Sequence, residues 1–192
     1  MRTKKLSDRC MAIAGFVSAG ESVADIGSDH AYVPIYLVRE GISPFAVLTD
    51  VKPGPLEKTR ASVEKAIASS RNHSEICLTD SLANRRRFRC EQSQECVFDL
   101  RLGDGLAALS KAEVDTVIIA GMGGETIISI LEADTKKASS FRKYILQPRT
   151  KTELLAGWLE GSGWKVMIKT TAEEKGRMCD IIVCVPKEEE ND

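Results

Sequence analysis

Apolar positions along the chain alternate between short continuous runs and a helical period of about three to four residues. The short runs predict seven strands, at 22–26, 45–49, 97–102, 114–120, 144–146, 164–169 and 180–185. The helical period predicts helices between them, at 6–17, 32–40, 56–68, 127–131 and 152–159. This alternation is typical of an α/β fold, with a mostly parallel sheet and helices on both of its faces.

The end of the chain departs from this alternation. The last two predicted strands have no helix between them, so they can pair antiparallel through a loop at 172–178. We therefore expect a Rossmann-like, seven-stranded sheet that is mostly parallel and has an antiparallel last strand. One domain at 1–186 would hold this sheet, and a charged, frayed tail would follow at 187–192.

The segment 69–95 shows no clear period, which is unusual for a connection of this length in a compact domain. We expect it to be an irregular insertion. Within it, a phenylalanine is surrounded by four arginines: Arg85, Arg86, Arg87 and Arg89. Such a charge run is most often a solvated surface. The alternative is a flap that contacts RNA phosphates and stacks its aromatic ring on a base.

Composition narrows the class of protein. Of the 192 residues, 43% are hydrophobic and 29% are charged, which is typical of a folded globular chain. The net charge of −1 gives no general attraction to nucleic acid, so RNA binding would need a local patch. No apolar run reaches the length of a membrane span, and the N-terminus lacks a signal peptide, so we expect a cytoplasmic protein without a membrane partner.

Cysteine spacing argues against a metal site. The chain has six cysteines and two histidines, but no two cysteines have the close spacing typical of a zinc site. We therefore expect free thiols in a reducing compartment and no bound metal. The sequence predicts no particular oligomeric state.

The first predicted strand leads into an acidic turn. Asp25 lies in the strand, Gly27 follows it, and Ser28, Asp29 and His30 continue the turn. Ligands of open α/β sheets bind over such turns, at the C-terminal edge of the strands. Carboxylates on both sides of Gly27 disfavour a pyrophosphate, which needs close, neutral backbone. They favour a cationic, hydroxyl-rich ligand such as S-adenosylmethionine, which carries a sulfonium, an ammonium group and a ribose diol.

Later turns at the same edge add further polar groups. Asp50 ends the second strand about 20 residues after the first turn, where an acidic residue commonly binds ribose hydroxyls. A helix cap or a turn is the structural alternative for Asp50. Asp104, between two glycines, can accept a hydrogen bond from an adenine amino group or can simply shape a turn. The glycines around Met122 leave room for a flat base, and they would equally suit the start of a helix.

Other residues near these turns also have two interpretations. His30, beside Asp29, is either catalytic or structural. Tyr32 can stack on a base or pack at the start of its helix. Gln147 and Pro148 follow a strand and can fix the loop that covers a target base.

Taken together, these segments resemble the bacterial tRNA (adenine(22)-N1)-methyltransferases, which act on the D arm of tRNA. The resemblance lies in the helix at 6–17 with Arg9, the loop that begins at Asp50, and the motifs at 23–34, 101–106, 120–124 and 146–148. It covers nearly the whole chain outside 69–95. It implies a class I methyltransferase fold and the transfer of a methyl group from S-adenosylmethionine to N1 of an adenine in tRNA.

The same resemblance assigns roles to residues. Those facing the cofactor would be Asp25, Gly27, Ser28, Asp50, Val51, Asp104, Gly105, Ala120, Gly121 and Met122. Those facing the target base would be Asp29, His30, Tyr32, Gln147 and Pro148. No nucleophilic side chain is required, because the N1 lone pair can attack the methyl group directly. The main task of the site would be alignment of the reacting atoms.

The chain differs from the family pattern in several places. Family members usually continue into a helical C-terminal domain that helps to hold tRNA, whereas this chain ends at Asp192. The segment 69–95 is longer than the linker of the family, and Arg149 stands where asparagine is common. The alternatives are a methyltransferase of another substrate, a non-catalytic RNA-binding protein with the same fold, and a nicotinamide-dependent oxidoreductase, which the acidic first turn disfavours.

Overall fold

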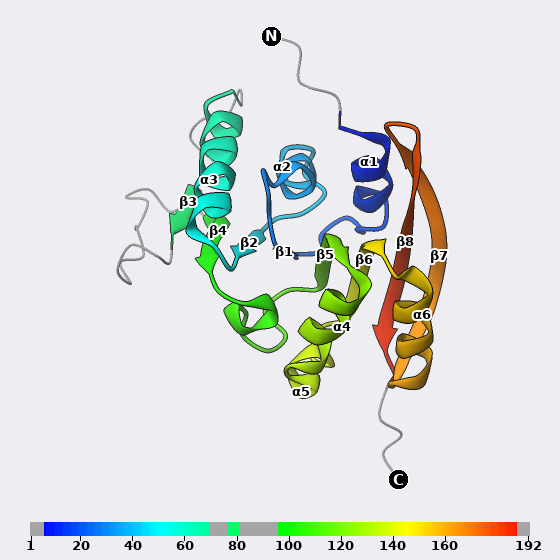
Figure 1. The fold of residues 1–192 in the computed structure, drawn as a ribbon. Helices are drawn as coiled ribbons and strands as arrows, with labels where there is room; N and C mark the ends of the chain where they lie inside the picture. Colours follow the sequence, from blue (N-terminus) through cyan, green and yellow to red (C-terminus); the bar gives the residue numbers. More distant parts are fainter. Residues whose placement is uncertain (1–5, 70–76, 81–95, 188–192) are drawn as a thin grey trace.

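The structure is a computed structural model that describes residues 6–69, 77–80 and 96–187 (Figure 1). Its strands are β1 (Val23–Ile26), β2 (Ala46–Asp50), β3 (Cys77–Asp80), β4 (Cys96–Leu102), β5 (Thr116–Gly123), β6 (Lys143–Thr150), β7 (Trp164–Glu174) and β8 (Arg177–Pro186). They form one sheet in the order β3-β4-β2-β1-β5-β6-β8-β7. All neighbouring strands are parallel except where β8 pairs with β6 and with β7. The predicted antiparallel last strand is therefore confirmed.

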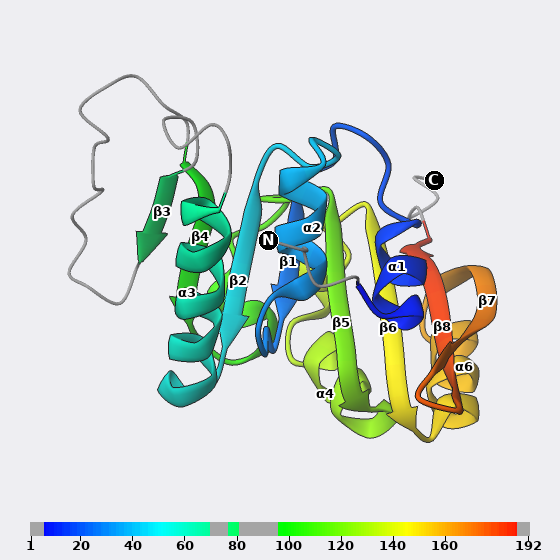
Figure 2. The same cartoon turned by 90° about the horizontal axis from the view of Figure 1, so that it is seen from above.

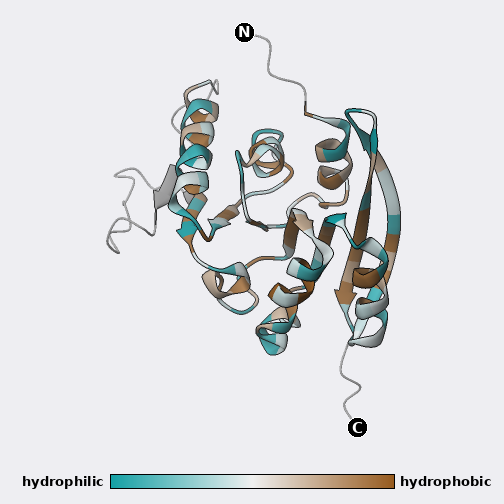
Figure 3. Cartoon of the chain, in the orientation of Figure 1, coloured by the Kyte–Doolittle hydropathy of each residue, from teal (hydrophilic) through white to brown (hydrophobic). Residues whose placement is uncertain are grey.

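Helices cover both faces of the sheet, as predicted (Figure 1). One face carries α1 (Asp8–Ala14), α2 (Tyr32–Arg39) and α3 (Pro53–Ala68). The other carries the 3₁₀ turn η1 (Gly105–Ala108) and the helices α4 (Gly124–Glu132), α5 (Thr135–Ala138) and α6 (Thr152–Gly161). Figure 3 shows the apolar positions concentrated in the central strands and on the inner faces of the helices. A sheet that is buried on both faces explains the continuous apolar runs in the sequence.

Local signals account for the starts of two helices. The Ser7 hydroxyl accepts a hydrogen bond from the Cys10 N–H at 3.3 Å and caps α1. This helix ends at Ala14, earlier than the apolar period predicted, because the following residues form single turns. Pro53 begins α3, where its missing N–H leaves no hydrogen bond unmade.

Two segments differ from the sequence expectation. Within the segment expected to be irregular, residues 77–80 form β3, a strand too short to show a period in the sequence. The loop expected at 172–178 is strand except for Lys175 and Gly176, whose φ angles of 52° and 76° form a tight hairpin turn. The arginines at 85–89 lie outside the described residues.

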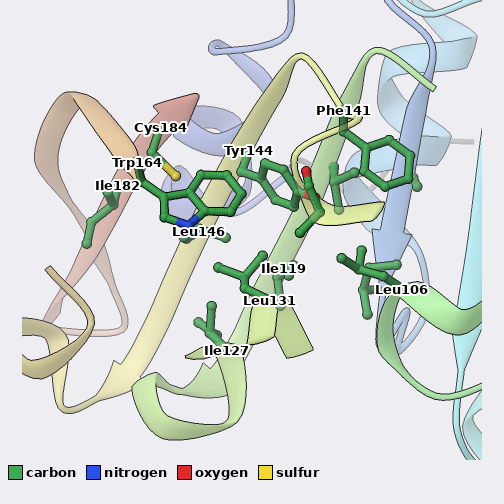
Figure 4. Packing of buried hydrophobic residues seen from close by; sticks show 14 of the residues in the cluster. Leu106, Ile119, Ile127, Leu131, Phe141, Tyr144, Leu146, Trp164, Ile182 and Cys184 are labelled. Atoms are coloured by element: carbon green, nitrogen blue, oxygen red, sulfur yellow. The ribbon is translucent and has the colours of Figure 1, made fainter. Parts of the chain in front are cut away.

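An aromatic group anchors the antiparallel end of the sheet. Tyr144 in β6 lies edge-on to Trp164 in β7, with ring centroids 5.1 Å apart, and to Phe141, at 6.2 Å (Figure 4). Its hydroxyl donates to the carbonyl of Ala138 at 2.9 Å, which satisfies the one polar group of this buried ring. This packing fixes β6 and the β7–β8 hairpin relative to the central strands.

The arrangement brings the loops that carry the candidate residues to one edge. Strands β1, β2, β4, β5 and β6 are parallel, so their C-terminal ends lie together. Strand β7 runs in the same direction as β6, because both are antiparallel to β8. The turn of the β7–β8 hairpin therefore lies at the same edge, beside the ends of β5 and β6 (Figure 2).

Candidate active site

The turn after β1 is built around Gly27. The N–H groups of Gly27 and Ser28 both donate to the carbonyl of Thr49 in β2, at 2.8 Å. Gly27 has a φ of 76°, and a Cβ at this position would press against the terminal methyl group of the Met122 side chain. The left-handed backbone conformation favours glycine here, whereas the flexible Met122 side chain could move aside. The turn is thus held against the ends of β2 and β5, the strands that carry the next candidate residues.

Asp25 and Ser28 lock the same turn from inside. The Ser28 hydroxyl donates to Asp25 Oδ2 at 2.7 Å and lies 3.0 Å from the Asp25 carbonyl. From α3, the buried Thr59 hydroxyl donates to the carbonyl of Ser28. Burial raises the pKa of Asp25 to about 6, although the Ser28 hydrogen bond and the charge of Arg9 oppose this shift. A carboxylate held in this way gains from a cationic partner.

Asp50 and Asp104 lie on neighbouring loops at the same edge. Asp50 Oδ1 accepts from the N–H of Lys52 at 2.8 Å, so one carboxylate oxygen shapes the turn, as the structural alternative predicted. The Gly103 N–H donates to the carbonyl of Asp50 at 3.0 Å, which joins the two loops. Asp104 is exposed and precedes η1, and Val51 is also exposed. One carboxylate oxygen of Asp50 accepts from the turn, so the other oxygen is compatible with binding ribose hydroxyls.

The segment from Asp29 to Tyr32 has a strained backbone, and its Asp29 and Tyr32 side chains are exposed. His30 and Ala31 have φ angles of 69° and 49°, a left-handed conformation that residues other than glycine rarely adopt. The His30 ring is stacked on Tyr32, with centroids 5.3 Å apart, and its Nε2 lies 3.8 Å from Asp29 Oδ1. Its Nδ1 is 3.5 Å from the Ser62 hydroxyl of α3. Strained backbone of this kind persists where the surrounding structure holds it, often at functional sites.

Gln147 is buried rather than turned toward solvent. Strands β5 and β6 continue through Gly121 and Pro148, where the sequence predicted loops. Gln147 is 2% exposed, and its Oε1 accepts from the Gly121 N–H at 3.2 Å and from Arg9 Nη1 at 2.9 Å. Its Nε2 donates to the carbonyl of Pro148 at 2.8 Å. Any effect of Gln147 on a ligand therefore passes through the backbone that it holds.

Two side chains outside the predicted loops take part in the site. Arg9 reaches Gln147 from α1, 138 residues away in the sequence, so no local spacing could reveal the contact. Thr59 reaches the first turn from α3. The predicted cofactor-facing and base-facing residues all lie at the C-terminal edge, with Ala120 and Met122 partly buried at the end of β5. The arrangement gathers carboxylates and small residues beside an exposed aromatic pair.

Comparison with known proteins places this geometry in a family. The chain matches a family described as a methyltransferase domain, over residues 6–90 and 85–182. It is 31% identical, over 183 residues, to the tRNA (adenine(22)-N(1))-methyltransferase of Bacillus subtilis, and the match covers 95% of this chain. The crystal structure of the B. subtilis m1A22 tRNA methyltransferase superimposes with a TM-score of 0.75 at 30% identity, covering 95% of this chain and 67% of that one.

The chain belongs to the tRNA (adenine(22)-N1)-methyltransferase family. A second relative in this family is a Streptococcus pneumoniae protein, provisionally assigned as a tRNA (m1A22) methyltransferase and solved in complex with S-adenosyl-L-methionine. It superimposes with a TM-score of 0.76 at 30% identity, covering 98% of this chain and 76% of that one. The present chain spans 66% of the length of the B. subtilis relative. The resemblance inferred from the motifs is confirmed.

In the ranges 6–69, 77–80 and 96–187, no group of three or more His, Cys, Asp or Glu side chains is arranged to hold a metal ion. Within the same ranges, no helix is long and apolar enough to cross a membrane.

Proposed function

We propose that the chain transfers a methyl group from S-adenosylmethionine to N1 of adenine 22 in tRNA. The observation that carries the proposal is the match to the S. pneumoniae protein solved with S-adenosyl-L-methionine, which extends over 98% of this chain. The name of the B. subtilis relative supplies the target nucleotide. Because the substrate would be tRNA, we also propose that the protein works in the cytoplasm.

The chemistry of the residues at the C-terminal edge suits this cofactor. Asp50 would accept from the ribose hydroxyls with the carboxylate oxygen that does not serve its turn. Asp104, which is exposed on the next loop, would accept from the adenine amino group. Asp25 would favour the cationic methionine end, since a partly buried carboxylate gains from a positive partner. Neighbouring backbone would complete the site at Gly27, Ser28, Val51, Gly105, Ala120, Gly121 and Met122.

The main task of the protein in this reaction would be to align adenine N1 with the methyl group of the cofactor. When bound, S-adenosylmethionine would supply an electrophilic methyl group, which the in-plane lone pair of adenine N1 can attack without a nucleophilic side chain while the methyl–sulfur bond breaks. The residues at the ends of β5 and β6 would hold the base in line with the methyl group, and such positioning can lower a barrier by about 7–11 kcal/mol in ideal cases. Asp29 would stabilise the positive charge that develops on the ring.

The target atom lies on the Watson–Crick edge, so the base must leave its stack before it reacts, at a cost of a few kcal/mol. Tyr32 and His30 offer a stacked, partly exposed aromatic surface that can replace the lost stacking. Pro148 would limit the movement of the base from the other side. The cofactor would thus contact the loops around Asp25 and Asp50, and the target base would contact His30, Tyr32 and Pro148.

The decisive experiment uses a tRNA transcript, S-adenosylmethionine and the purified chain, followed by mass spectrometry of the nucleosides. We expect 1-methyladenosine in the wild-type transcript and none in a transcript with guanosine at position 22. Asp29→Ala should keep cofactor affinity within a few-fold and lower the rate strongly. Cofactor binding without any methylated tRNA would favour another substrate or a non-catalytic RNA-binding role, and methylation at another position would overturn the assignment of adenine 22.

A further inference from the structure

A line of polar contacts connects the β7–β8 hairpin to the end of β5. Arg9 in α1 donates through Nε to Glu174 Oε2, at 2.9 Å, beside the hairpin turn. It donates through Nη1 to Gln147 Oε1, also at 2.9 Å. Gln147 in turn accepts from the Gly121 N–H at 3.2 Å. Arg9 therefore joins α1 to the hairpin and to β6 directly, and to β5 through Gln147, at the C-terminal edge, where Figure 2 shows the strands ending together.

We propose that Arg9 is a positioning residue of the methyl-transfer site, which fixes the Gln147 carboxamide and, through it, the backbone of Gly121 and Pro148. This inference rests on the proposed function, because those backbone groups border the place where methyl group and base would meet. Arginine suits the role because its planar fork can bind a carboxylate and an amide at once. The Glu174 carboxylate holds the fork in place.

The hydrogen-bond donors dictate how the Gln147 carboxamide is oriented. Two N–H groups, from Arg9 and Gly121, converge on one atom, and only the carboxamide oxygen can accept from both. The nitrogen then faces the Pro148 carbonyl, to which it donates. The bond from Arg9 is charge-assisted and shorter than the one from Gly121, so it contributes more to holding the amide.

The backbone at Gly121 needs such a tether. Gly121 has a φ of 80°, and the pairing of β5 with β6 shifts its register between Ala120 and Met122. A shift of this kind interrupts the regular ladder of hydrogen bonds. The Gln147 oxygen takes the Gly121 N–H at this interruption. Loss of the tether would let the end of β5 move, and a misplacement of about 1 Å can slow a reaction by about a hundredfold.

Arg9 has a second, electrostatic effect that gives an independent readout. Its positive charge lowers the pKa of Asp25, against the burial that raises it to about 6. The other groups in this balance are the Ser28 hydroxyl, which donates to Asp25, and the Glu174 carboxylate, which pairs with Arg9. Without Arg9, Asp25 should become protonated at a higher pH, and a cationic ligand should begin to lose affinity there.

Four variants separate these effects. Arg9→Met removes both the charge and the fork, whereas Arg9→Lys keeps the charge but cannot bridge Glu174 and Gln147 together. Gln147→Met removes the amide and leaves Arg9 in place. The matched control is Arg142→Met, which breaks an ion pair of a side chain that is 82% exposed. Thermal melting of each variant checks that it is folded.

We expect Arg9→Met to lower kcat for methylation of the tRNA transcript by about 10–100-fold while KM for tRNA changes by less than about threefold. Arg9→Lys should fall between Arg9→Met and wild type. The double variant Arg9→Met/Gln147→Met should lose no more than the worse single variant, because both changes break the same link. The pH at which S-adenosylhomocysteine affinity falls by half should rise in Arg9→Met and stay unchanged in Gln147→Met and in the control.

Losses that multiply in the double variant, or a kcat for Arg9→Met within about twofold of the control, would overturn the inference. If wild type binds S-adenosylhomocysteine but methylates no tRNA, the proposed function fails instead. The role of Arg9 is then decided by calorimetry alone. An unshifted pH profile for Arg9→Met would refute that role, and a shifted profile would support it.

Discussion

Asp25 shows how a single side chain can link stability to function. Burial raises the pKa of this carboxyl from 3.8 to about 6, so the folded chain holds the proton more tightly than the unfolded chain does. A folded-state pKa above the unfolded value stabilises the fold below pH 3.8, and this contribution is lost as pH rises through about 6. At neutral pH the ionised group therefore weakens the fold, which is a common trade-off at sites that bind charged ligands.

Asp25→Asn should remove this penalty. Because the amide carries no charge to desolvate, we expect the free energy of unfolding to rise by about 1–3 kcal/mol near pH 7.5 and to change little near pH 4. Cofactor affinity should fall in the same variant. Urea unfolding at the two pH values measures the first effect and calorimetry the second. Asp29→Asn, whose side chain is 63% exposed, is the control, and an equal gain at both pH values would contradict the mechanism.

Asp50 serves both its turn and, on our proposal, the ribose, and two substitutions can separate the roles. Asp50→Asn keeps an oxygen that can accept from the Lys52 N–H, whereas Asp50→Ala removes it. We expect both variants to bind S-adenosylmethionine more weakly, by about 1–3 kcal/mol in the alanine variant, since a charged acceptor is lost. Only Asp50→Ala should also melt earlier. Unchanged affinity in calorimetry would remove Asp50 from the cofactor site.

At the scale of the elements, an arginine fixes the loop that carries Asp104. Arg101 in β4 uses all of its N–H groups, donating to the carboxylates of Asp99 and Glu113 and to the carbonyl of Ala108 at distances from 2.5 to 3.0 Å. The hydrogen bonds that Arg101 donates to Glu113, more than the other contacts, raise the pKa of Arg101 above its ordinary value. The strand end and the segment after η1 are thereby joined across the loop.

Arg101→Lys should loosen this loop, because an ammonium group cannot reproduce the fork. We expect a loss of about 1–3 kcal/mol in the free energy of unfolding and a several-fold weaker affinity for S-adenosylhomocysteine. Chemical unfolding and calorimetry test the two effects. Arg142→Lys, in an exposed ion pair, should change neither by a measurable amount. A destabilised Arg101→Lys that binds the cofactor normally would make the link purely structural.

The elements also show which features the sequence could predict. The turn at Gly27 was predictable, because an apolar strand, a glycine and a helical period follow one another within a few residues. The hairpin strands were predicted too short, because the end of β7 is largely exposed and polar, without a strong alternation. The buried state of Gln147 was not predictable, since it depends on Arg9, which is distant in sequence.

At the scale of the whole molecule, acidic groups of two kinds set the pH dependence of stability. Among the residues that the structure describes, Asp25 has a raised pKa, whereas four carboxyls have lowered pKa values: Glu21, Glu113, Asp115 and Glu174. In Asp115 the hydrogen bonds from Ser22 lower the pKa. In Glu21, burial alone would raise the pKa, but the hydrogen bond from Lys143 and smaller contacts outweigh it.

These two kinds of group act in opposite directions as the solution is acidified. A lowered folded-state pKa gives stability that is present above the unfolded value, near 4, and is lost as pH falls through the folded value. Asp25 instead adds stability as pH falls from about 6 to 3.8. We therefore expect the free energy of unfolding to rise on mild acidification from neutral pH, to reach a maximum between about pH 4.5 and 6, and then to fall.

Two variants can show which carboxyls cause the rise and the fall of the free energy of unfolding with pH, as measured by urea unfolding across the pH range. Asp25→Asn should flatten the limb between neutral pH and the maximum and leave the acid limb in place. Glu21→Gln should reduce the slope of the acid limb, because the amide has no carboxyl to protonate and the ion pair with Lys143 is removed at every pH, and should leave the other limb unchanged. A stability that rises steadily from acid to neutral pH in the wild-type chain would show that Asp25 is not desolvated in solution, and would remove the physical basis for its trade-off between stability and ligand binding.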